Sequence, residues 1–425
     1  MDTRELNRRE FIQAAGATLA LSPLALADES PPKPARIAII GVGGRGTGLL
    51  RIMLKMPNVE IPAICDINER NLKRGLGIAE KALGKRPEGY MKGPHDYRRM
   101  LERDDFDGVL IATPAELHAE MAVDTMATGK HVGSEVPGAT GLDECWALVN
   151  TKEKTGKRYM LLENYFYAES RMMVHNMARK GLFGELTYAE CSYIHDCRSL
   201  RFQGNGELTW RGKWKRDAYG CLYPTHSLGP VSKWFGINRG DVMTELTSMM
   251  SAPRSLHAYA VKKFGEDSPQ AGIQFQCGDM CVTNIKTAND RLITVFYDSE
   301  SPRPASNFYL IQGTGGVYDS RKGIHIDGRS PRHKWESTGK YTTEFANDYW
   351  TKRGSAARKT GHGGGDYFVI SDFVEMVRQD REPLVDVYDS AAWSSLVELS
   401  GKSIDEKRTV PMVDFTRGKW KERKA

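Results

Sequence analysis

A glycine-rich turn near the start of the chain restricts the fold more than any other feature of the sequence. Gly41-Val42-Gly43-Gly44-Arg45-Gly46 follows a short apolar run and precedes an amphipathic one, which is the strand–turn–helix setting of a dinucleotide site. There, Gly41 permits the tight turn, Gly43 lets the backbone approach a pyrophosphate, and Gly46 lets the helix pack closely on the strand. Asp66 ends the next apolar run, where its carboxylate can bind both ribose hydroxyls and repel a 2′-phosphate. The sequence therefore predicts an NAD site rather than an NADP site.

The pattern on either side of this turn predicts an α/β fold. Apolar runs alternate with amphipathic ones, which indicates a doubly wound parallel sheet over residues 35–164, the NAD-binding Rossmann domain. We expect its strands at 35–40, 59–65, 108–113, 130–134 and 158–162, and its helices at 44–55, 68–83, 114–128 and 142–155.

After residue 164 the pattern changes to period-two alternation. It predicts a second, α+β domain over 165–412 with an open, mainly antiparallel sheet. A second copy of the chain can cover the open face, so the sequence is compatible with a homodimer or a higher oligomer and leaves the oligomeric state open. We expect strands at 186–194, 257–264, 280–287, 291–297 and 308–312, and helices at 168–179, 366–377 and 390–403.

The first 27 residues carry the pattern of an export signal. Asn7-Arg8-Arg9-Glu10-Phe11 is a twin-arginine pattern, and the apolar run 14–27 ends in Ala25-Leu26-Ala27, which is typical of a cleavage site. We expect a twin-arginine signal peptide at 1–27, the twin-arginine export machinery as a partner, and a periplasmic or otherwise exported protein. The run is shorter than the ~20 residues of a membrane span, and no other stretch suits one. A protein that is exported in the folded state carries its cofactor with it. We therefore expect a cofactor that is held tightly and that returns to its starting redox state within each turnover.

Charge and cysteine content exclude several other classes of protein. Of the net charge of +6, residues 417–425 carry five Lys/Arg and one Glu. We therefore expect a basic tail at 413–425 whose last nine residues, 417–425, are frayed, and a remainder that is nearly neutral, unlike a protein that binds nucleic acid. The seven cysteines are odd in number and scattered, which argues against a disulfide framework. Cys277 and Cys281 have no second pair at zinc-finger spacing, so we expect no metal site.

Polar residues follow three of the predicted parallel strands, at the sheet edge where ligands bind. His118 follows the strand at 108–113, Glu135-Val136-Pro137 the strand at 130–134, and Glu163-Asn164 the strand at 158–162. We expect them to lie near the glycine turn. For His118 an alternative stays open: it can be a buried core residue whose ring nitrogens form hydrogen bonds, without a role at the ligand site.

These features resemble the glucose–fructose oxidoreductase/inositol dehydrogenase superfamily over nearly all of the chain after residue 27. Val136 stands where that superfamily usually has a lysine that handles the substrate hydroxyl proton, and Leu222 stands where it commonly has an aspartate. A narrower resemblance, to glycoside hydrolase family 109, fits both departures. It is carried by Glu163-Asn164-x-x-Tyr167, Tyr193-x-His195-Asp196, Trp210-Arg211, Tyr223-Pro224-Thr225-His226-x-Leu228-Gly229-Pro230, Gly236-Ile237-Asn238-Arg239-Gly240 and His362-Gly363-Gly364.

The resemblance implies a set of residues for each part of the site. His226 is the first choice for proton transfer, and Tyr223, three residues earlier, is close enough to share its site. Tyr193 and Tyr167 can act as acid or base if a neighbouring cation such as Arg211 lowers their pKa. Trp210 and Trp214 form either a sugar-stacking platform or a plain helix face. The implied catalytic residues are His226, Tyr223, Tyr193 and Tyr167. The residues implied to contact the sugar are Tyr193, Arg211, Tyr223, Pro224, Thr225 and His226. The cofactor residues, with the glycines of the motif, are Gly41, Gly43, Arg45, Gly46, Asp66, Ala115, Glu116, Leu117, His118, Glu135, Val136 and Asn164.

Family 109 contains NAD-dependent α-N-acetylgalactosaminidases, so the resemblance implies an exported hydrolase that acts on a small glycoside. Its cycle would be redox-neutral: oxidation of the sugar at carbon 3, elimination of the aglycone, addition of water and reduction. One alternative is an oxidoreductase that exchanges hydride between two sugars on a captive cofactor. Another is a non-catalytic sugar-binding protein with structural NAD. Ala305 and Trp214 depart from the family's substrate contacts, so the sugar, the aglycone, the anomeric preference and the stereochemical outcome stay open.

Overall fold

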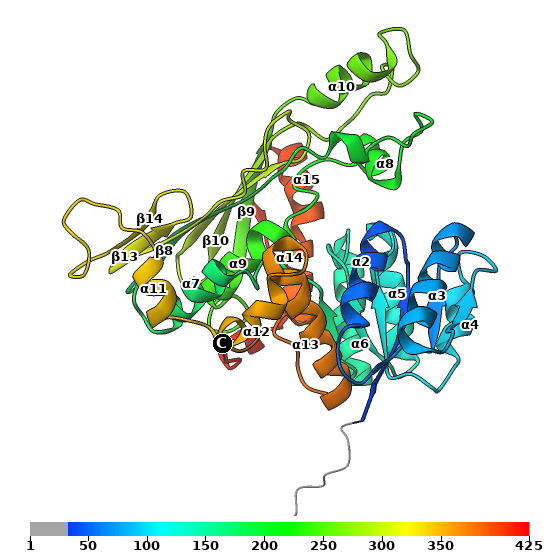
Figure 1. The fold of residues 1–425 in the computed structure, drawn as a ribbon. Coiled ribbons are helices and arrows are strands. Elements are labelled where there is room, and N and C mark those ends of the chain that lie inside the picture. The colour runs from blue at the N-terminus through cyan, green and yellow to red at the C-terminus, as the bar shows by residue number, and fades with distance from the viewer. Residues whose placement is uncertain (1–32, 425) are drawn as a thin grey trace, which may run out of the picture. The chain divides into compact units, whose positions relative to one another are not determined.

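Two β-sheets organise residues 33–424, the part of the chain that the computed structural model describes (Figure 1). The expected signal peptide, residues 1–27, lies outside the described residues. One sheet is parallel throughout and the other is mainly antiparallel, which confirms the predicted fold class. Within residues 33–424, no helix is both long enough and apolar enough to cross a bilayer.

The parallel sheet has the strand order β4-β3-β1-β5-β6-β7, and β2 pairs with β1 outside this path. Because its strands are parallel, their carboxyl ends meet at one edge, where a ligand can bind. The strands are β1 (Ala35–Ile40), β2 (Val59–Glu60), β3 (Ala63–Cys65), β4 (Glu88–Tyr90), β5 (Gly108–Ile111), β6 (His131–Ser134) and β7 (Tyr159–Leu161). The helices between them are α2 (Gly44–Met53), α3 (Glu69–Leu83), α4 (Asp96–Leu101), α5 (His118–Ala127) and α6 (Leu142–Thr155).

The second sheet has the order β14-β13-β12-β8-β11-β10-β9-β15, and its pairs are antiparallel except β8 with β11. The strands are β8 (Leu186–Ile194), β9 (Met243–Met250), β10 (Cys281–Thr287), β11 (Leu292–Asp298), β12 (Tyr309–Gly313), β13 (Gly316–Asp319), β14 (Gly323–Ile326) and β15 (Val410–Pro411). The helices are α7 (Glu169–Arg179), α8 (Trp210–Asp217), α9 (Thr225–Phe235), α10 (Ser255–Phe264), α11 (Gly339–Glu344), α12 (Asp348–Ala357), α13 (Gly365–Gln379), α14 (Val387–Ser394) and α15 (Leu396–Glu406).

Three expected elements are corrected by the structure. The strand predicted at 257–264 is part of helix α10, because Leu256 and Ala260, four residues apart, bury one helical face against Phe202 and Phe275. The strand predicted at 59–65 is interrupted at Pro62, which has no N–H for a sheet ladder. The helix predicted at 390–403 is divided into α14 and α15 at Ser395.

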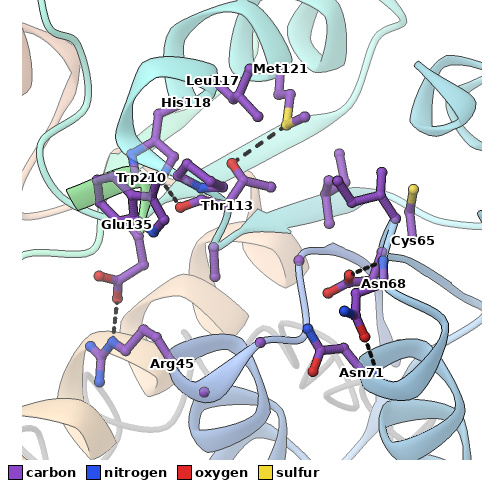
Figure 2. Close-up of a pocket in the computed structure, with 18 of the residues that line it drawn as sticks. Arg45, Cys65, Asn68, Asn71, Thr113, Leu117, His118, Met121, Glu135 and Trp210 are labelled. Atoms are coloured by element: carbon purple, nitrogen blue, oxygen red, sulfur yellow. Dashed lines mark hydrogen bonds and ion pairs between the residues drawn. The ribbon is translucent and has the colours of Figure 1, made fainter. Parts of the chain in front are cut away.

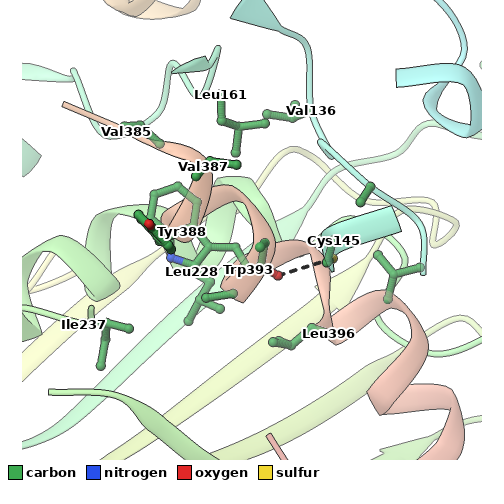
Figure 3. Packing of buried hydrophobic residues seen from close by; sticks show 14 of the residues in the cluster. Val136, Cys145, Leu161, Leu228, Ile237, Val385, Val387, Tyr388, Trp393 and Leu396 are labelled. Carbon is green, nitrogen blue, oxygen red and sulfur yellow. Dashed lines mark hydrogen bonds between the residues drawn. The ribbon is translucent and has the colours of Figure 1, made fainter. Parts of the chain in front are cut away.

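Helices from the second half of the chain pack onto the parallel sheet, so the two sheets share a core (Figure 1). On α13, Phe373 lies so close to Gly133 of β6 that a side-chain carbon there would come within 2.7 Å of its ring. On α14, Trp393 packs among residues from α6, α9 and β7, including Cys145, Leu228 and Leu161 (Figure 3). This packing holds the second domain at the carboxyl edge of the parallel sheet.

The basic C-terminal segment is folded against the protein, so the expectation of a frayed tail is wrong for its described residues. Phe415 is buried and its ring lies 4.8 Å from that of Trp146. Arg417 pairs with Glu153, and Arg423 pairs with Asp386. The cations of this segment thus pair with carboxylates on α6 and at the start of α14. Those partners are distant in the chain, so the local sequence does not indicate them.

Candidate active site

A cavity of about 540 Å³ lies at the carboxyl edge of the parallel sheet (Figure 2). The glycine turn and Asp66 line it from the first domain, and Trp210, Arg211 and Tyr223 line it from the second. Its volume falls within the roughly 300–1,000 Å³ of ordinary ligand pockets.

The glycine turn has the geometry that a pyrophosphate requires. Gly41 has a φ of +88°, and a side-chain carbon at Gly46 would lie 1.9 Å from the Gly41 carbonyl oxygen. Near Gly43, by contrast, the closest atom to such a carbon would be Asn71 Nδ2 at 4.0 Å, so this face of the backbone is open. The N-terminus of α2 has no side-chain cap and no acidic residue in its first turn. Its free amide groups can therefore receive a phosphate.

Asp66 lies beside this turn and is fixed by backbone amides. Its Oδ2 accepts a hydrogen bond from the Val42 amide and its Oδ1 accepts one from the Asn68 amide, both at 2.8 Å. Asn68, rather than Asp66, caps helix α3. Each carboxylate oxygen keeps a second lone pair for a ribose hydroxyl.

An ion-pair network joins the glycine turn to helix α13. Arg45 donates to Glu135 Oε1 at 2.8 Å and to Asp366 Oδ2 at 2.9 Å. Asp366 Oδ1 accepts from Asn164 Nδ2 at 2.6 Å, and its Oδ2 lies 2.9 Å from His362 Nδ1. Burial alone would raise the pKa of Asp366, but the His362 hydrogen bond and the Arg45 charge hold that pKa well below its usual range. Asp366 is therefore an ionised anchor for both domains.

The other expected cofactor residues lie at different distances from the cavity. Leu117, His118 and Val136 line it, whereas Ala115 is buried and Glu116 is exposed outside it. The His118 ring nitrogens lie 2.7 Å from the Pro137 carbonyl oxygen and 2.9 Å from that of Thr113. His118 therefore connects two strand-end loops, as the core alternative predicts, while its ring also faces the cavity (Figure 2).

His226, in the first turn of α9, is held by a buried carboxylate. Its Nδ1 lies 2.7 Å from Glu163 Oε2, and the other Glu163 oxygen accepts from the Tyr165 amide at 2.7 Å. An ionised carboxylate only accepts, so Nδ1 carries the hydrogen and Nε2 is the nitrogen that can take a proton. The Tyr165 ring stacks on the imidazole at 4.2 Å between centroids. The arrangement suits proton transfer.

Two of the expected catalytic tyrosines surround this imidazole. The Tyr223 and Tyr193 ring centroids lie 5.1 Å and 5.5 Å from that of His226. Burial raises the pKa of both phenols, and the opposing charge of Arg211 on Tyr223 does not outweigh it. The condition for a base, a pKa lowered by a cation, is therefore not met at Tyr193, and both phenols keep their protons and can act as donors.

Tyr167, the fourth expected catalytic residue, is not at the cavity. Its side chain is fully buried, its hydroxyl donates to Asp372 Oδ2 at 2.7 Å, and its ring packs on Phe368 of α13. The turn before α7 directs it into the core. The structure therefore assigns Tyr167 to packing rather than to chemistry.

The segment before α9 forms the wall of the cavity that the second domain contributes. The Arg211 guanidinium lies 4.2 Å above the Trp210 ring, and the rings of Trp210 and Trp214 are 6.3 Å apart. Pro224 and Thr225 are buried and begin α9, so they support His226 without lining the cavity. The site residues that sequence reasoning missed are Glu163, Tyr165 and Asp366. The sequence shows Glu163 in a strand-end pair and in the family motif, with no role attached, and Asp366 only as the expected start of a helix.

Comparisons with known proteins agree with this site. Residues 167–422 match the family described as "Glycosyl hydrolase 109, C-terminal domain", and residues 35–163 match "Oxidoreductase family, NAD-binding Rossmann fold". The second match confirms a nicotinamide dinucleotide as the class of cofactor. Together the two matches confirm the resemblances found in the sequence.

Full-length relatives and solved structures give the same picture. A glycosyl hydrolase family 109 protein of Stenotrophomonas maltophilia (strain K279a) is 37% identical, over 99% of this chain and 97% of that protein. An α-N-acetylgalactosaminidase of Shewanella oneidensis is 38% identical, over 99% of this chain and 98% of that protein. Levoglucosan dehydrogenase in complex with NADH superposes with a TM-score of 0.69 at 17% identity, over 90% of this chain and 100% of that one, which shows a shared fold.

Proposed function

Because this chain belongs to glycosyl hydrolase family 109, we propose that it is an α-N-acetylgalactosaminidase-like glycosidase that retains NAD in its Rossmann domain. The observation that carries this proposal is the position of the His226–Glu163 pair beside Tyr223. Tyr223 lines the same cavity as the glycine turn. His226 and Glu163 do not line the cavity themselves, but the His226 ring packs on Tyr223, which does. A proton-transfer pair thus lies directly behind the wall of a dinucleotide cradle, an arrangement that a glycosidase that works with two carboxylates does not need.

The residues at the parallel-sheet edge fit NAD. Its pyrophosphate would lie against the open backbone of Gly43 and the N-terminus of α2, and its ribose hydroxyls against Asp66. Asp66 would repel the 2′-phosphate of NADP. Asn164, by contrast, is buried and does not line the cavity; its Nδ2 donates to Asp366, which pairs with Arg45 of the glycine turn. When bound, NAD would supply a reversible acceptor for a sugar hydride.

The chain's own residues would handle the protons. His226 Nε2 takes the proton of a sugar hydroxyl, and Glu163 stabilises the resulting imidazolium through Nδ1. Tyr223 and Tyr193, which keep their protons, donate to oxygens that gain negative charge. Arg211 and Trp210 supply a cationic and aromatic surface for the sugar. Tyr223, Arg211 and Trp210 line the cavity, and the rings of His226 and Tyr193 pack against Tyr223.

The same proposal includes export. The twin-arginine pattern at Asn7–Gln13 supports transfer of the folded protein with NAD already bound. Fractionation of cells that carry the full chain is expected to place the processed protein outside the cytoplasm. Substitution of Arg8 and Arg9 by Lys is expected to retain it inside, and unchanged export of that variant would contradict this part of the proposal.

The test of function is a panel of nitrophenyl α-glycosides given to the purified protein without added NAD. We expect nitrophenol release from the N-acetylgalactosaminide, and heat-released NAD close to one per chain by mass spectrometry. A sugar oxidoreductase would release no nitrophenol and would oxidise one sugar while it reduces another. Hydrolysis by protein that contains no nucleotide would contradict the proposal.

A further inference from the structure

A second, smaller cavity of about 120 Å³ adjoins the main one. The two share four lining residues: Leu200, Trp210, Arg211 and Tyr223. Among the described residues, the charged side chains that line the smaller cavity are all cations, namely Arg201, Arg211 and Lys215. A wall of this kind at the edge of a sugar site points to a ligand with negative charge.

The buried charges beside this cavity do not balance. Arg201, Lys215 and Glu300 are only 6%, 4% and 1% exposed in their side chains. Arg201 Nη2 lies 2.6 Å and Lys215 Nζ lies 3.3 Å from the same oxygen, Glu300 Oε1. Burial alone would raise the pKa of Glu300, but the charges of Lys215 and Arg201 lower it, so the carboxylate is ionised. Two buried cations thus share one carboxylate, which leaves one positive charge in excess within this contact group. The nearby buried carboxylate of Asp298 accepts from the Glu300 and Ser301 amides and pairs with neither cation.

The hydrogen bonds show which cation is available to a ligand. Lys215 Nζ contacts Cys277 Sγ at 3.2 Å, the Tyr297 hydroxyl and Glu300, so its three hydrogens are taken. Arg201 uses Nε and Nη2 on Glu300 and Ser299, whereas its Nη1 has no hydrogen-bond partner among residues 33–424. Lys215 therefore supplies charge, and Arg201 supplies both charge and a free donor.

We propose that the smaller cavity binds the anionic group of the substrate, a carboxylate or a sulfate ester carried by the glycoside. An excess buried charge is costly unless an opposite charge offsets it, and guanidinium groups suit planar or tetrahedral oxyanions. Arg201 is the buried donor, and Arg211, which lines both cavities, connects this subsite to the sugar. The inference rests on the proposed function and narrows its substrate class to acidic glycosides.

Calorimetric titration of the NAD-loaded full chain tests this with two matched pairs of sugars. The pairs are galactose with galacturonate, and N-acetylgalactosamine with its 6-sulfate. We expect at least one acidic sugar to bind about tenfold or more tightly than its neutral partner, and the two pairs separate a carboxylate ligand from a sulfate ester. Equal affinities within both pairs, or tighter binding of both neutral sugars, would overturn the proposal.

Two variants and a control test the residues. Lys215→Met leaves Glu300 paired with Arg201 and removes the excess charge. The ratio of the affinity for the acidic sugar to that for its neutral partner, called the preference below, should therefore fall about tenfold. Arg211→Gln acts at a partly exposed side chain and should lower the preference even if Lys215→Met does not fold. Lys213→Met, at an exposed position of the same helix, should preserve it. A preference that survives both Arg211→Gln and Lys215→Met would contradict the assignment.

These titrations do not depend on turnover. A protein that hydrolyses a neutral glycoside but shows no preference in binding would refute this inference and leave the proposed function standing. A protein that prefers acidic sugars but hydrolyses no glycoside would refute the proposed function and leave the subsite standing.

Discussion

His226 Nδ1 lies 2.7 Å from Oε2 of Glu163, a carboxylate with no solvent exposure. The two residues are 63 positions apart in the chain and come from α9 and the end of β7. This contact fixes which imidazole nitrogen carries the hydrogen, and it stabilises the ring once a second proton arrives. Its removal should therefore affect the chemical step more than substrate binding.

Glu163→Gln replaces this carboxylate by a neutral amide that fits the same space. We expect kcat to fall about 10²–10⁴-fold with little change in KM, because general acid–base catalysis contributes an effect of that size. Steady-state hydrolysis of the best nitrophenyl glycoside measures it. Glu169→Gln, at a half-exposed carboxylate paired with Arg358, is the matched control and should leave kcat within twofold. A kcat for Glu163→Gln close to that of the control would show that the pair does not serve the reaction.

Tyr223→Phe and Tyr167→Phe separate a phenol at the cavity from one in the core. Tyr223→Phe should lower kcat at least tenfold and leave the unfolding midpoint nearly unchanged, because Tyr223 lines the cavity and its hydroxyl donates no hydrogen bond to another residue within 33–424. Tyr167→Phe should leave kcat within twofold but lower the free energy of unfolding by about 1 kcal/mol, because it removes a buried hydrogen bond to Asp372. Kinetics and urea denaturation of both variants check these expectations. A kcat lowered more than twofold in Tyr167→Phe would show that Tyr167 takes part in the reaction.

Gly43→Val should displace the cofactor without damaging the fold. The only protein atom that a side-chain carbon there meets within 4.0 Å is Asn71 Nδ2, so the valine would occupy the space for the pyrophosphate. We expect the NAD retained after purification to fall at least tenfold, with an unchanged circular dichroism spectrum. Gly48→Ala, on the exposed side of the same helix, should keep its NAD. Full retention of NAD by Gly43→Val would place the dinucleotide elsewhere.

The ionised Asp366 should make stability depend on pH in the acid range. Burial would raise its pKa, but His362 and Arg45 hold the pKa below its usual range. Its contribution is therefore present above the unfolded-state pKa of about 3.9 and is lost as the pH falls further toward the lowered folded-state value. Asp366→Asn should be less stable than the wild type at pH 7, and the gap should narrow below about pH 4. Urea denaturation across this range measures the gap, and a gap that widens on acidification would contradict the assignment.

The parts of the site that the sequence predicts are those built from neighbouring residues. Gly41, Gly43, Gly46 and Asp66 lie within one strand–helix–strand unit, so their spacing alone fixes their relative places. The parallel sheet follows from the same local alternation. In the second domain, α10 was mistaken for a strand because a short apolar run has no distinct period.

The contacts that define the chemistry join distant residues and are therefore hidden from local reasoning. Asp366 reaches Arg45 across 321 positions, and Arg201 reaches Glu300 across 99. The family motif places Tyr167 in the site, but the core packing of α13 decides its orientation. Charge alone predicts a frayed tail, because it cannot show that Asp386 and Glu153 lie where they pair with the cations of that tail.

The proposed function, with the redox-neutral elimination that the family resemblance implies, is tested most directly by hydrolysis in D₂O followed by NMR of the product sugar. A cycle that removes and later restores the proton on carbon 2 predicts deuterium at that carbon after a single turnover. The control is the same product incubated with enzyme in D₂O for the same time. Complete hydrolysis with no deuterium at carbon 2 would show direct displacement at the anomeric carbon and contradict the account.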